Sequence, residues 1–440
     1  MIKRFIRRVL GLSQDGMVRL PSEEHSLKRD AISPAAAKVC SVLREAGFCG
    51  YVVGGAVRDL LLGIVPKDFD IATDARPEQV KPLFRRALII GRRFRLVHVM
   101  MGAETVEVST FRGADVDTAE KDEHGRVLRD NVFGTQEEDA RRRDFTVNAL
   151  YFDPMSEEVV DFHGGLADIR KRTLRVIGDP ATRYREDPVR MLRAVRLAAK
   201  LGLTLDAATR EPIRDLAPLM ERVPPARLFD EMLKLLMSGH ASASLRQLRE
   251  VGLHKGLLPL LDVILEQPLG ERFVTLALAQ TDERVLAERP VSPAFLFAAL
   301  LWHEVLAAWK TRQARAERAV PALEAAMDEV LDTQCAKLAI TRKLTATMRE
   351  VWAMQPRFEH RSGQRADRLL EAPRFRMAYD FLALRAASGE VPADLEEWWR
   401  AFQSADPEAR KSMLLPDTDP RKRRRRRRKK RPAAQAVPAT

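Results

Sequence analysis

The pattern of apolar residues changes near residue 177, and this change limits the folds open to the chain. Before it, short runs of apolar and β-branched residues alternate with helical pieces, which predicts a mixed sheet with helices packed against it. After it the strand pattern stops, and helices separated by Pro and Gly continue to about residue 415. The sequence therefore predicts an α+β fold class, with a small mixed-sheet head followed by an all-helical body.

The expected elements of the head are short. Strands are predicted at 51–53, 69–73, 96–101, 105–111, 147–152 and 159–162, and helices at 35–47, 56–62 and 77–84. Residues 113–131 are polar and without period, which is typical of a mobile loop. A chain of 440 residues exceeds one typical core. We expect five segments: a flexible N-terminal segment at 1–30, the head at 31–175, a helical neck at 176–240, the helical body at 241–415 and a disordered polybasic tail at 416–440.

Most of the net charge of +13 comes from one run of cations, RKRRRRRRKKR at 421–431. Removing these eleven residues from the 75 Lys and Arg leaves 64, against 62 Asp and Glu. Because like charges repel and nothing apolar surrounds them, the run is not expected to fold. The net charge therefore says little about what the folded part binds.

Several classes of protein are excluded by composition. No apolar run approaches the eighteen or more residues of a membrane span. Three scattered cysteines, Cys40, Cys49 and Cys335, are too few for a disulfide framework or a zinc site, which favours a reducing compartment and a cytoplasmic location. The start, MIKRFIRRVLGL, mixes basic with apolar residues and lacks a cleavage site, so we expect a frayed terminus. An amphipathic helix that touches a membrane surface or RNA is the alternative.

Residues that carry chemistry are densest at 51–73. Gly54 and Gly55 end a predicted strand and open a helix, a geometry in which backbone N–H groups approach a triphosphate; a simple turn is the alternative. Asp68 and Asp70 stand at the start of the next strand, where alternation puts both carboxylates on one face. Adjacent carboxylates repel unless a divalent cation lies between them, and Mg²⁺ prefers such oxygens together with substrate phosphates. A solvated acidic turn is the alternative.

A two-metal site for displacement at phosphorus needs a third carboxylate. Glu107 is one candidate, because an acid in the middle of a strand is costly if buried unless it binds a cation; an exposed strand face is the alternative. Asp144 is the other candidate, between three arginines and a β-run. It suits the metals, a sugar hydroxyl or a salt bridge with Arg142 or Arg143.

Asp187 and Arg190 lie three residues apart at the start of a helix predicted at 187–202, so they are neighbours on one face. A carboxylate beside a guanidinium presents acceptor and donor edges to a nucleobase. The alternative is a charge at a helix N-terminus with an i,i+3 salt bridge.

Four successive segments resemble the motifs of the class II template-independent nucleotidyltransferases. This family belongs to the polymerase-β superfamily and contains bacterial poly(A) polymerase and the CCA-adding tRNA enzymes. The segments are GGAVRDLLLG (54–63), KDFDIAT (67–73), RRDFTVNAL (142–150) and REDPVRMLRAVRLAAKLG (185–202), and the match covers about residues 33–240. The helical body, the basic tail, IIGRRFRLVHV (89–99) and RVPPARLFDEMLKLL (222–236) are similar to the poly(A) polymerases in particular.

The resemblance implies that the head at 31–175 is a nucleotidyltransferase domain and that the neck binds nucleotide and RNA. Asp68 and Asp70 would ligate the catalytic metals, Glu107 matches the third-carboxylate strand, and Asp144 is counted among the catalytic positions. The positions implied for binding the nucleotide or neutralising its phosphates are Gly54, Gly55, Arg58, Lys67, Arg92, Arg93, Arg142, Arg143, Asp187 and Arg190.

The function implied is template-independent polyadenylation of RNA 3′ ends, in which AMP passes from ATP to the 3′-hydroxyl and pyrophosphate leaves. The mechanism implied uses two Mg²⁺ ions, with Mn²⁺ as an alternative. A CCA-adding enzyme shares this chemistry but changes nucleotide during the reaction. A non-catalytic RNA-binding decay scaffold is the alternative from another class, and the intact Gly54-Gly55 and Asp68-x-Asp70 argue against it.

The polybasic tail is interpreted as a tether. Its eleven cations suit contact with several RNA phosphates without reading bases, which would hold an RNA near a site that has no template to grip. A solubilising tail, or one that binds RNA-decay proteins, is the alternative.

Overall fold

In the computed structural model of the chain, the described residues are 17–91, 95–113, 120–121, 127–129, 132–253 and 268–416. The chain divides into two compact units, Met1–Arg227 with Ala243–Leu257, and Leu228–Ser242 with Leu258–Thr440. The boundary predicted at 175/176 falls inside the first unit. The five predicted domain ranges remain a prediction.

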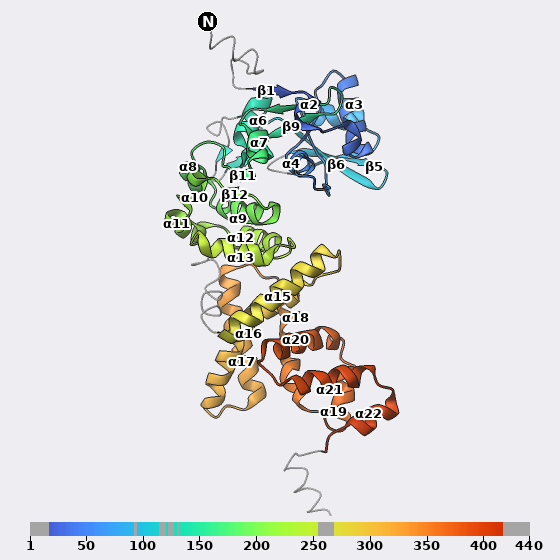
Figure 1. Cartoon of the computed structure of the whole chain (residues 1–440), viewed down its shortest axis with the longest axis vertical. Coiled ribbons are helices and arrows are strands. Elements are labelled where there is room, and N and C mark those ends of the chain that lie inside the picture. Colours follow the sequence, from blue (N-terminus) through green and yellow to red (C-terminus); the bar gives the residue numbers. More distant parts are fainter. Residues whose placement is uncertain are drawn as a thin grey trace, which may run out of the picture. The chain divides into compact units, whose positions relative to one another are not determined.

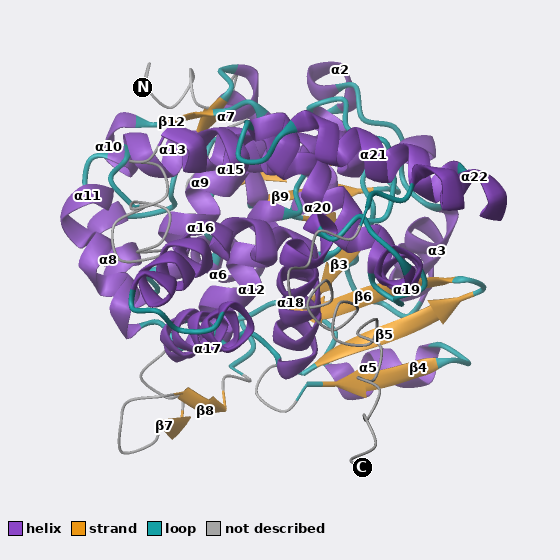
Figure 2. Ribbon diagram, turned by 90° about the horizontal axis from the view of Figure 1, so that it is seen from below, coloured by secondary structure: helices purple, strands orange, loops and turns teal. Residues whose placement is uncertain are grey.

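The first unit is built on an eight-stranded mixed sheet. In spatial order its strands are β1 (Val18–Leu20), β10 (Glu158–Asp161), β9 (Leu150–Asp153), β2 (Tyr51–Val53), β3 (Asp70–Thr73), β6 (Glu104–Thr110), β5 (Leu96–Met101) and β4 (Ala87–Ile90). β3 and β6 run parallel, whereas the other neighbouring pairs are antiparallel. Figure 2 shows β3, β6, β5 and β4 side by side. Two short pairs lie outside this sheet: β7 (Glu120–Lys121) with β8 (Val127–Arg129), and β11 (Thr173–Leu174) with β12 (Thr204–Leu205).

Helices surround the sheet and follow it in the first unit (Figure 1). Up to Leu216 they are α2 (Ser22–His25), α3 (Pro34–Glu45), α4 (Gly55–Leu61), α5 (Pro77–Val80), α6 (Gln136–Arg142), α7 (Gly165–Arg170), α8 (Pro180–Glu186), α9 (Val189–Leu201), α10 (Ala207–Arg210) and α11 (Ile213–Leu216). In α3, the Ser33 hydroxyl accepts a hydrogen bond from the Ala36 N–H at 3.0 Å, and Pro34 takes a first-turn position where a missing N–H is tolerated. The buried face of α3 packs on β2, β3 and β6.

A buried cluster around the central strands holds the sheet together. Its members are Tyr51, Val53, Ala72, Phe111, Ala140, Ala149, Tyr151, Val160 and Ile177. The rings of Tyr51, Phe111 and Tyr151 lie within 6.4 Å of one another, centroid to centroid. Since a slip of one residue would turn these side chains to the other face, their burial fixes the strand register. That register in turn positions the polar residues on the central strands.

The second unit is helical. α12 (Pro225–Leu236) and α13 (Ala241–Glu250) cross the boundary between the units, and the following helices are α15 (Pro268–Leu286), α16 (Pro293–Ala314), α17 (Ala319–Lys337), α18 (Arg342–Met354), α19 (Gln364–Leu370), α20 (Phe375–Ser388), α21 (Ala393–Ser404) and α22 (Pro407–Met413). α16 carries apolar residues on every side and is buried over most of its first half, as such a helix has to be. The described residues after β12 form no strand. The predicted α+β fold class is confirmed.

The structure differs from the sequence-based expectation at several places in the first unit, one of which is β4, where no strand was expected. Val18–Leu20, expected in a flexible segment, form β1, because pairing with β10 satisfies their backbone groups at the sheet edge. The strand expected at 147–152 begins at Leu150, after a 3-10 turn at Thr146–Asn148. The strand expected at 69–73 begins at Asp70, so Asp68 precedes it and strand alternation does not apply to Asp68.

Several expectations fall on other parts of the chain. The N-terminal stretch to residue 16, Arg92, Arg93 and the tail from residue 417 lie outside the described residues. The loop expected at 113–131 contains the paired β7 and β8, and most of its remaining residues also lie outside the described part. No helix within the described part is long and apolar enough to span a bilayer.

Candidate active site

The turn between β2 and α4 requires glycine. Gly54 has φ +70° and ψ −124°, which strains any residue with a Cβ, and a Cβ there would lie 3.1 Å from Nη1 of Arg143. The Gly54 N–H donates to the Leu150 carbonyl at 3.3 Å. This N–H is therefore used within the sheet rather than offered to a phosphate, and the turn instead makes room for the Arg143 guanidinium.

Asp70 and Glu107 occupy paired positions on two parallel strands. Asp70 begins β3 and Glu107 lies in the middle of β6, directly opposite in the register. Side chains at such paired positions point to the same face of the sheet. Val106 and Val108 are buried on the other face, and the Glu107 side chain is 44% exposed. His98 on β5 brings its Nε2 within 3.7 Å of Glu107 Oε2.

The negative charge of Glu107 makes ionisation of Asp70 more costly. The pKa of Asp70 is raised from 3.8 to about 6, first by withdrawal from bulk water and then by the negative charge of Glu107. The charge of Asp68 acts in the same direction, whereas Arg143 opposes it. The Asp70 residue is exposed, but it lines two pockets. The surrounding pocket residues account for its partial withdrawal from bulk water. A cation between Asp70 and Glu107 would remove this repulsion.

The donor set at this place fits a magnesium ion that arrives with a nucleotide. Among the described residues, no three His, Cys, Asp or Glu side chains are grouped closely enough to hold a metal ion by themselves. Asp70 and Glu107 offer two carboxylates, and Asp68 is near enough for its charge to act on Asp70. Mg²⁺ is commonly held by one or two carboxylates together with water and substrate phosphates.

A chain of buried polar contacts runs from α4 to α9. Arg58, 6% exposed, donates to Asp59 Oδ1 at 2.8 and 2.6 Å and to Asn148 Oδ1 at 2.6 Å. Asn148 Nδ2 donates to Asp144 Oδ1 at 3.0 Å. Asp144 Oδ2 forms an ion pair with Arg193 Nη2 at 2.7 Å, without the alignment of a hydrogen bond. Asp144 is thus tied to α9 rather than to the carboxylate pair on β3 and β6.

Arg143 is held beside Asp70 by Asp139, Tyr151 and the Asn148 carbonyl, to which its Nη1 donates at 3.3 Å. Its Nη2 and Nε donate to Asp139 Oδ2 at 3.0 and 3.3 Å, and Nε also donates to the Tyr151 hydroxyl at 3.2 Å. The Tyr151 hydroxyl donates to the same Asp139 oxygen at 2.7 Å. The guanidinium lies 5.1 Å from the Tyr151 ring centroid. Asp139 and Tyr151 therefore fix a cation next to the carboxylates.

Two pockets share Asp70, Arg142 and Arg143 in their walls. The larger, of about 440 Å³, is lined among the described residues by seven cationic side chains: Arg58, Arg142, Arg143, Arg190, Arg193, Arg196 and Lys200. The smaller, of about 300 Å³, includes Glu107, Ser109, Arg112 and Asp139. A pocket of the larger size and charge suits the polyphosphate of a nucleotide.

Asn148, Arg193, Arg196 and Lys200 line the larger pocket but are missing from the sequence-based set. A signal for three of them was available, because α9 repeats cations at intervals of three or four from Arg190 onward, which places them on one helix face. Burial lowers the pKa of Lys200, and the charges of Arg58 and Arg196 add to that lowering although Asp59 opposes it. This wall is therefore crowded with positive charge that an anion would relieve.

Asp187 and Arg190 line the same pocket but do not pair with each other. Asp187 lies between α8 and α9, and its Oδ2 accepts a hydrogen bond from Arg227 Nη2 at 3.0 Å. Its Oδ1 is buried and has no hydrogen-bond partner among the described residues. Arg190 Nη1 donates to the Arg183 carbonyl at 2.8 Å and to Glu186 Oε2 at 3.0 Å. The alternative of a simple i,i+3 salt bridge is therefore wrong.

The remaining predicted residues divide into two groups. Lys67 and Asp68 are exposed and line neither pocket. Arg142 lines both pockets and donates from Nη1 to the Gly113 carbonyl at 2.7 Å. The predicted residues that the structure brings together around the larger pocket are Gly54, Gly55, Arg58, Asp70, Arg142, Arg143, Asp144, Asp187 and Arg190.

Comparison with known proteins identifies the family of the chain. Three family models match: the poly(A) polymerase head domain at residues 50–175, the probable RNA- and SrmB-binding site of polymerase A at 202–265, and the arginine-rich C-terminus of polymerase A at 315–432. The chain is 44% identical to poly(A) polymerase I of Salmonella typhi, over 96% of each chain. The chain belongs to the poly(A) polymerase family.

A second relative and a solved structure extend the comparison. Poly(A) polymerase I of Escherichia coli is 47% identical over 90% of this chain and 88% of its own. The crystal structure of the Bacillus stearothermophilus CCA-adding enzyme in complex with CTP aligns with a TM-score of 0.55 and 28% identity, covering 84% of this chain and 82% of that one. The resemblance of the four motifs to this family is confirmed, and the chain is a nucleotidyltransferase of the poly(A) polymerase family.

Proposed function

We propose that the protein adds AMP from ATP to RNA 3′ ends without a template. The observation that carries the proposal is the position of Asp70. It pairs with Glu107 across two strands, and it also lines the larger pocket, whose described lining includes seven cationic side chains. In the proposed reaction, the RNA 3′-hydroxyl oxygen bonds to the α-phosphorus while the bond from that phosphorus to pyrophosphate breaks. The identity to poly(A) polymerases, 44% over 96% of both chains, supports this substrate class.

The larger pocket takes the nucleotide. Arg193, Arg196 and Lys200 on α9 neutralise the triphosphate, and Arg143 stands between the triphosphate and Asp70. Asp187 Oδ1, a buried acceptor with no partner among the described residues, accepts from the amino group of the base. Arg227 fixes the other oxygen of this carboxylate, which restricts the base edge that Asp187 can accept from.

The smaller pocket takes the RNA 3′ end. It shares Asp70 with the nucleotide pocket and has Glu107 in its wall, so the hydroxyl and the α-phosphate meet at the carboxylate pair. Asp70 and Glu107, with Asp68 beside them, would hold Mg²⁺, and Mn²⁺ is the alternative ion. When bound, the metal neutralises phosphate charge and eases loss of the hydroxyl proton. Asp144, held by Asn148 and Arg193, supports the nucleotide pocket from behind.

The polybasic run and the cell compartment complete the proposal. Residues 421–431 tether RNA through its phosphates, with RNA-decay proteins as further partners. A cytoplasmic location is inferred from the three unpaired cysteines.

The test supplies the purified protein with one nucleoside triphosphate at a time and a generic RNA. Long tails with ATP alone are expected, and the Asp70→Asn variant should give none while Asp30→Asn, an exposed aspartate of the same unit, behaves as wild type. CTP incorporation confined to a tRNA end would instead identify the CCA-adding activity and overturn the proposal.

A further inference from the structure

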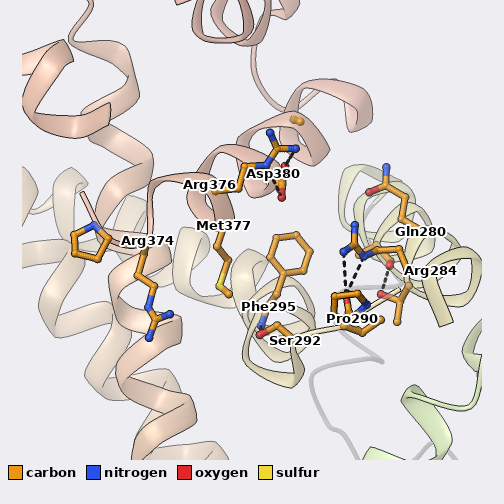
Figure 3. Close-up of a pocket in the computed structure, with 14 residues that line it drawn as sticks. Gln280, Arg284, Pro290, Ser292, Phe295, Arg374, Arg376, Met377 and Asp380 are labelled. Carbon is orange, nitrogen blue, oxygen red and sulfur yellow. Dashed lines mark hydrogen bonds and ion pairs between the residues drawn. The ribbon is translucent and has the colours of Figure 1, made fainter. Parts of the chain in front are cut away.

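A third pocket lies within the second unit, between α15, α16 and α20 (Figure 3). Its volume is about 480 Å³, within the range of small-molecule and cofactor sites. None of its lining residues belongs to the site around Asp70. The proposed reaction therefore leaves this pocket without a role.

One wall of the pocket is apolar and rigid. Phe295 and Met377 line it and are only half-buried, so part of their apolar surface faces the space. The Phe295 ring is held edge-on by Phe381, at 5.9 Å between centroids and an interplanar angle of 79°. A fixed aromatic face beside a polarisable thioether suits a flat ring system.

Three arginines also line the pocket, and they differ in whether their partner is a carboxylate or a neutral carbonyl. Arg376 makes a two-point contact with Asp380, at 3.0 and 3.3 Å, so those two charges offset each other. Arg284 donates to the Pro290 carbonyl at 3.2 and 2.9 Å, a neutral acceptor, and the charge of Asp380, which is paired with Arg376, acts on Arg284 only from a distance. Arg374 pairs with Glu350 at 3.1 Å, with both side chains about half exposed, and such a surface pair contributes little stability that another anion would have to replace.

The arrangement in Figure 3 suits a nucleotide with phosphates on both sides. In this view Arg284 and Arg374 stand on opposite sides of Phe295, and Gln280 projects from α15 next to Arg284. A glutamine amide offers a donor and an acceptor together, the pattern that pairs with N7 and N6 of adenine. Single-stranded nucleic acid is commonly bound by such aromatic faces flanked by cations.

We propose that this pocket binds one adenosine nucleotide of single-stranded RNA, with the base against Phe295 and Met377, its edge at Gln280 and the flanking phosphates at Arg284 and Arg374. The inference rests on the proposed function, because that function makes polyadenylated RNA the product. It adds a second place where the product is held, on a unit that supplies none of the residues lining the two pockets around Asp70.

The experiment measures binding of short labelled oligo(A) and oligo(U) to the full-length protein. Phe295→Leu, which keeps apolar volume but removes the aromatic face, should weaken oligo(A) binding about tenfold, the scale of one lost stacked base. Gln280→Leu, at an exposed position that does not threaten folding, should weaken oligo(A) binding and leave oligo(U) binding unchanged. Gln313→Leu, an exposed glutamine on α16 outside the pocket, is the matched control.

Two further readouts are needed. One tells whether the bound adenosine comes from RNA or from free ATP, and the other distinguishes failure of this inference from failure of the proposed function. Oligo(A) carrying a photoreactive adenine should cross-link near Phe295 or Met377, and excess free ATP should not displace it; displacement by ATP would contradict an RNA site. Wild-type oligo(A) affinity in both Phe295→Leu and Gln280→Leu would overturn the inference, whereas tail addition from ATP by these variants would still support the proposed function. Failure of the wild type to extend RNA with ATP would instead overturn the proposed function.

Discussion

Each unit buries an arginine in a polar network, yet only one of these networks opens onto a pocket. In the first unit, Arg58 is joined through Asn148 to Asp144, and all three line the nucleotide pocket. In the second unit, Arg385 donates to Glu390 at 2.9 Å and to Gln355 at 3.2 Å. None of the residues in this second network lines a described pocket.

In the second network, the polar groups of Arg385, Glu390 and Gln355 are hydrogen-bonded to one another, to Trp302 or to the backbone. We call it the closed network. Both carboxylate oxygens of Glu390 lie 3.0 Å from Trp302 Nε1, and the Arg385 guanidinium lies 4.9 Å from the Trp302 ring centroid. Gln355 donates to two backbone carbonyls at 3.1 Å. Burial of charge alone therefore does not mark a functional site. What distinguishes the first unit is the adjoining pocket, which Asp187 also lines and where its Oδ1 has no hydrogen-bond partner within the part of the chain that the structure describes.

Breaking the closed network should change stability rather than chemistry. Arg385→Met leaves the Glu390 carboxylate buried without its cation, and we expect a loss of about 3–5 kcal/mol in the free energy of unfolding. AMP transfer per folded molecule should be unchanged. Denaturant unfolding followed by circular dichroism measures the first quantity, with Arg376→Met, an exposed arginine of the same helix, as the control for a surface pair. A comparable loss in the control would remove the distinction between buried and surface pairs.

Breaking the contact between Arg227 and Asp187, which lines the nucleotide pocket, should change nucleotide choice. Arg227→Ala frees the Asp187 oxygen that it fixes, so the carboxylate can turn toward other bases. We expect the preference for ATP over CTP in kcat/KM to fall about tenfold, the scale of one charge-assisted hydrogen bond. Arg222→Ala, a nearby exposed arginine, should keep the wild-type preference. An unchanged preference in Arg227→Ala would mean that the Asp187–Arg227 pair is only structural.

The smallest effect concerns His303, which lies at the edge of the closed network, 3.7 Å from Glu390. Burial lowers the pKa of His303 below 6.5, and the charges of Arg385 and Lys310 act in the same direction, while Glu390 opposes them. The unfolded chain therefore takes up the proton first as pH falls, and stability present above the unfolded value near 6.5 is lost below it. The free energy of unfolding is measured at pH values above and below 6.5. In His303→Gln its decrease with falling pH should be smaller than in the wild type, by up to about 1.4 kcal/mol per pH unit. An identical pH dependence in the variant would contradict a buried neutral His303.

Local pattern made part of this site predictable. The strands at 51–53 and 96–101 and the end of α9 at Gly202 follow from apolar runs and from glycine, both of which act over a few residues. Glu107 was a candidate because of its place in a strand. Its partner could not be derived from local pattern, because the parallel pairing of β3 with β6 depends on contacts far apart in the chain.

The hydrogen-bond partners that position the side chains of the candidate site could not be predicted from the sequence. Asp139 and Tyr151 fix Arg143 through a contact between α6 and β9 that neither segment signals by itself. A salt bridge between Asp187 and Arg190 was the alternative interpretation, yet the partner of Asp187 is Arg227, forty residues away. Such side-chain partners are set by tertiary packing, which sequence periodicity does not encode.

The central claim is that Asp70 and Glu107, rather than Asp144, form the carboxylate pair at which AMP is transferred. The direct measurement is the single-turnover rate of AMP addition at saturating ATP and RNA for Glu107→Gln and Asp144→Asn, with thermal unfolding of each. We predict that Glu107→Gln loses rate by about 10²-fold or more at an unchanged melting temperature. Asp144→Asn should mainly lose stability and ATP affinity, because it breaks a buried network. A wild-type rate in Glu107→Gln would contradict the claim.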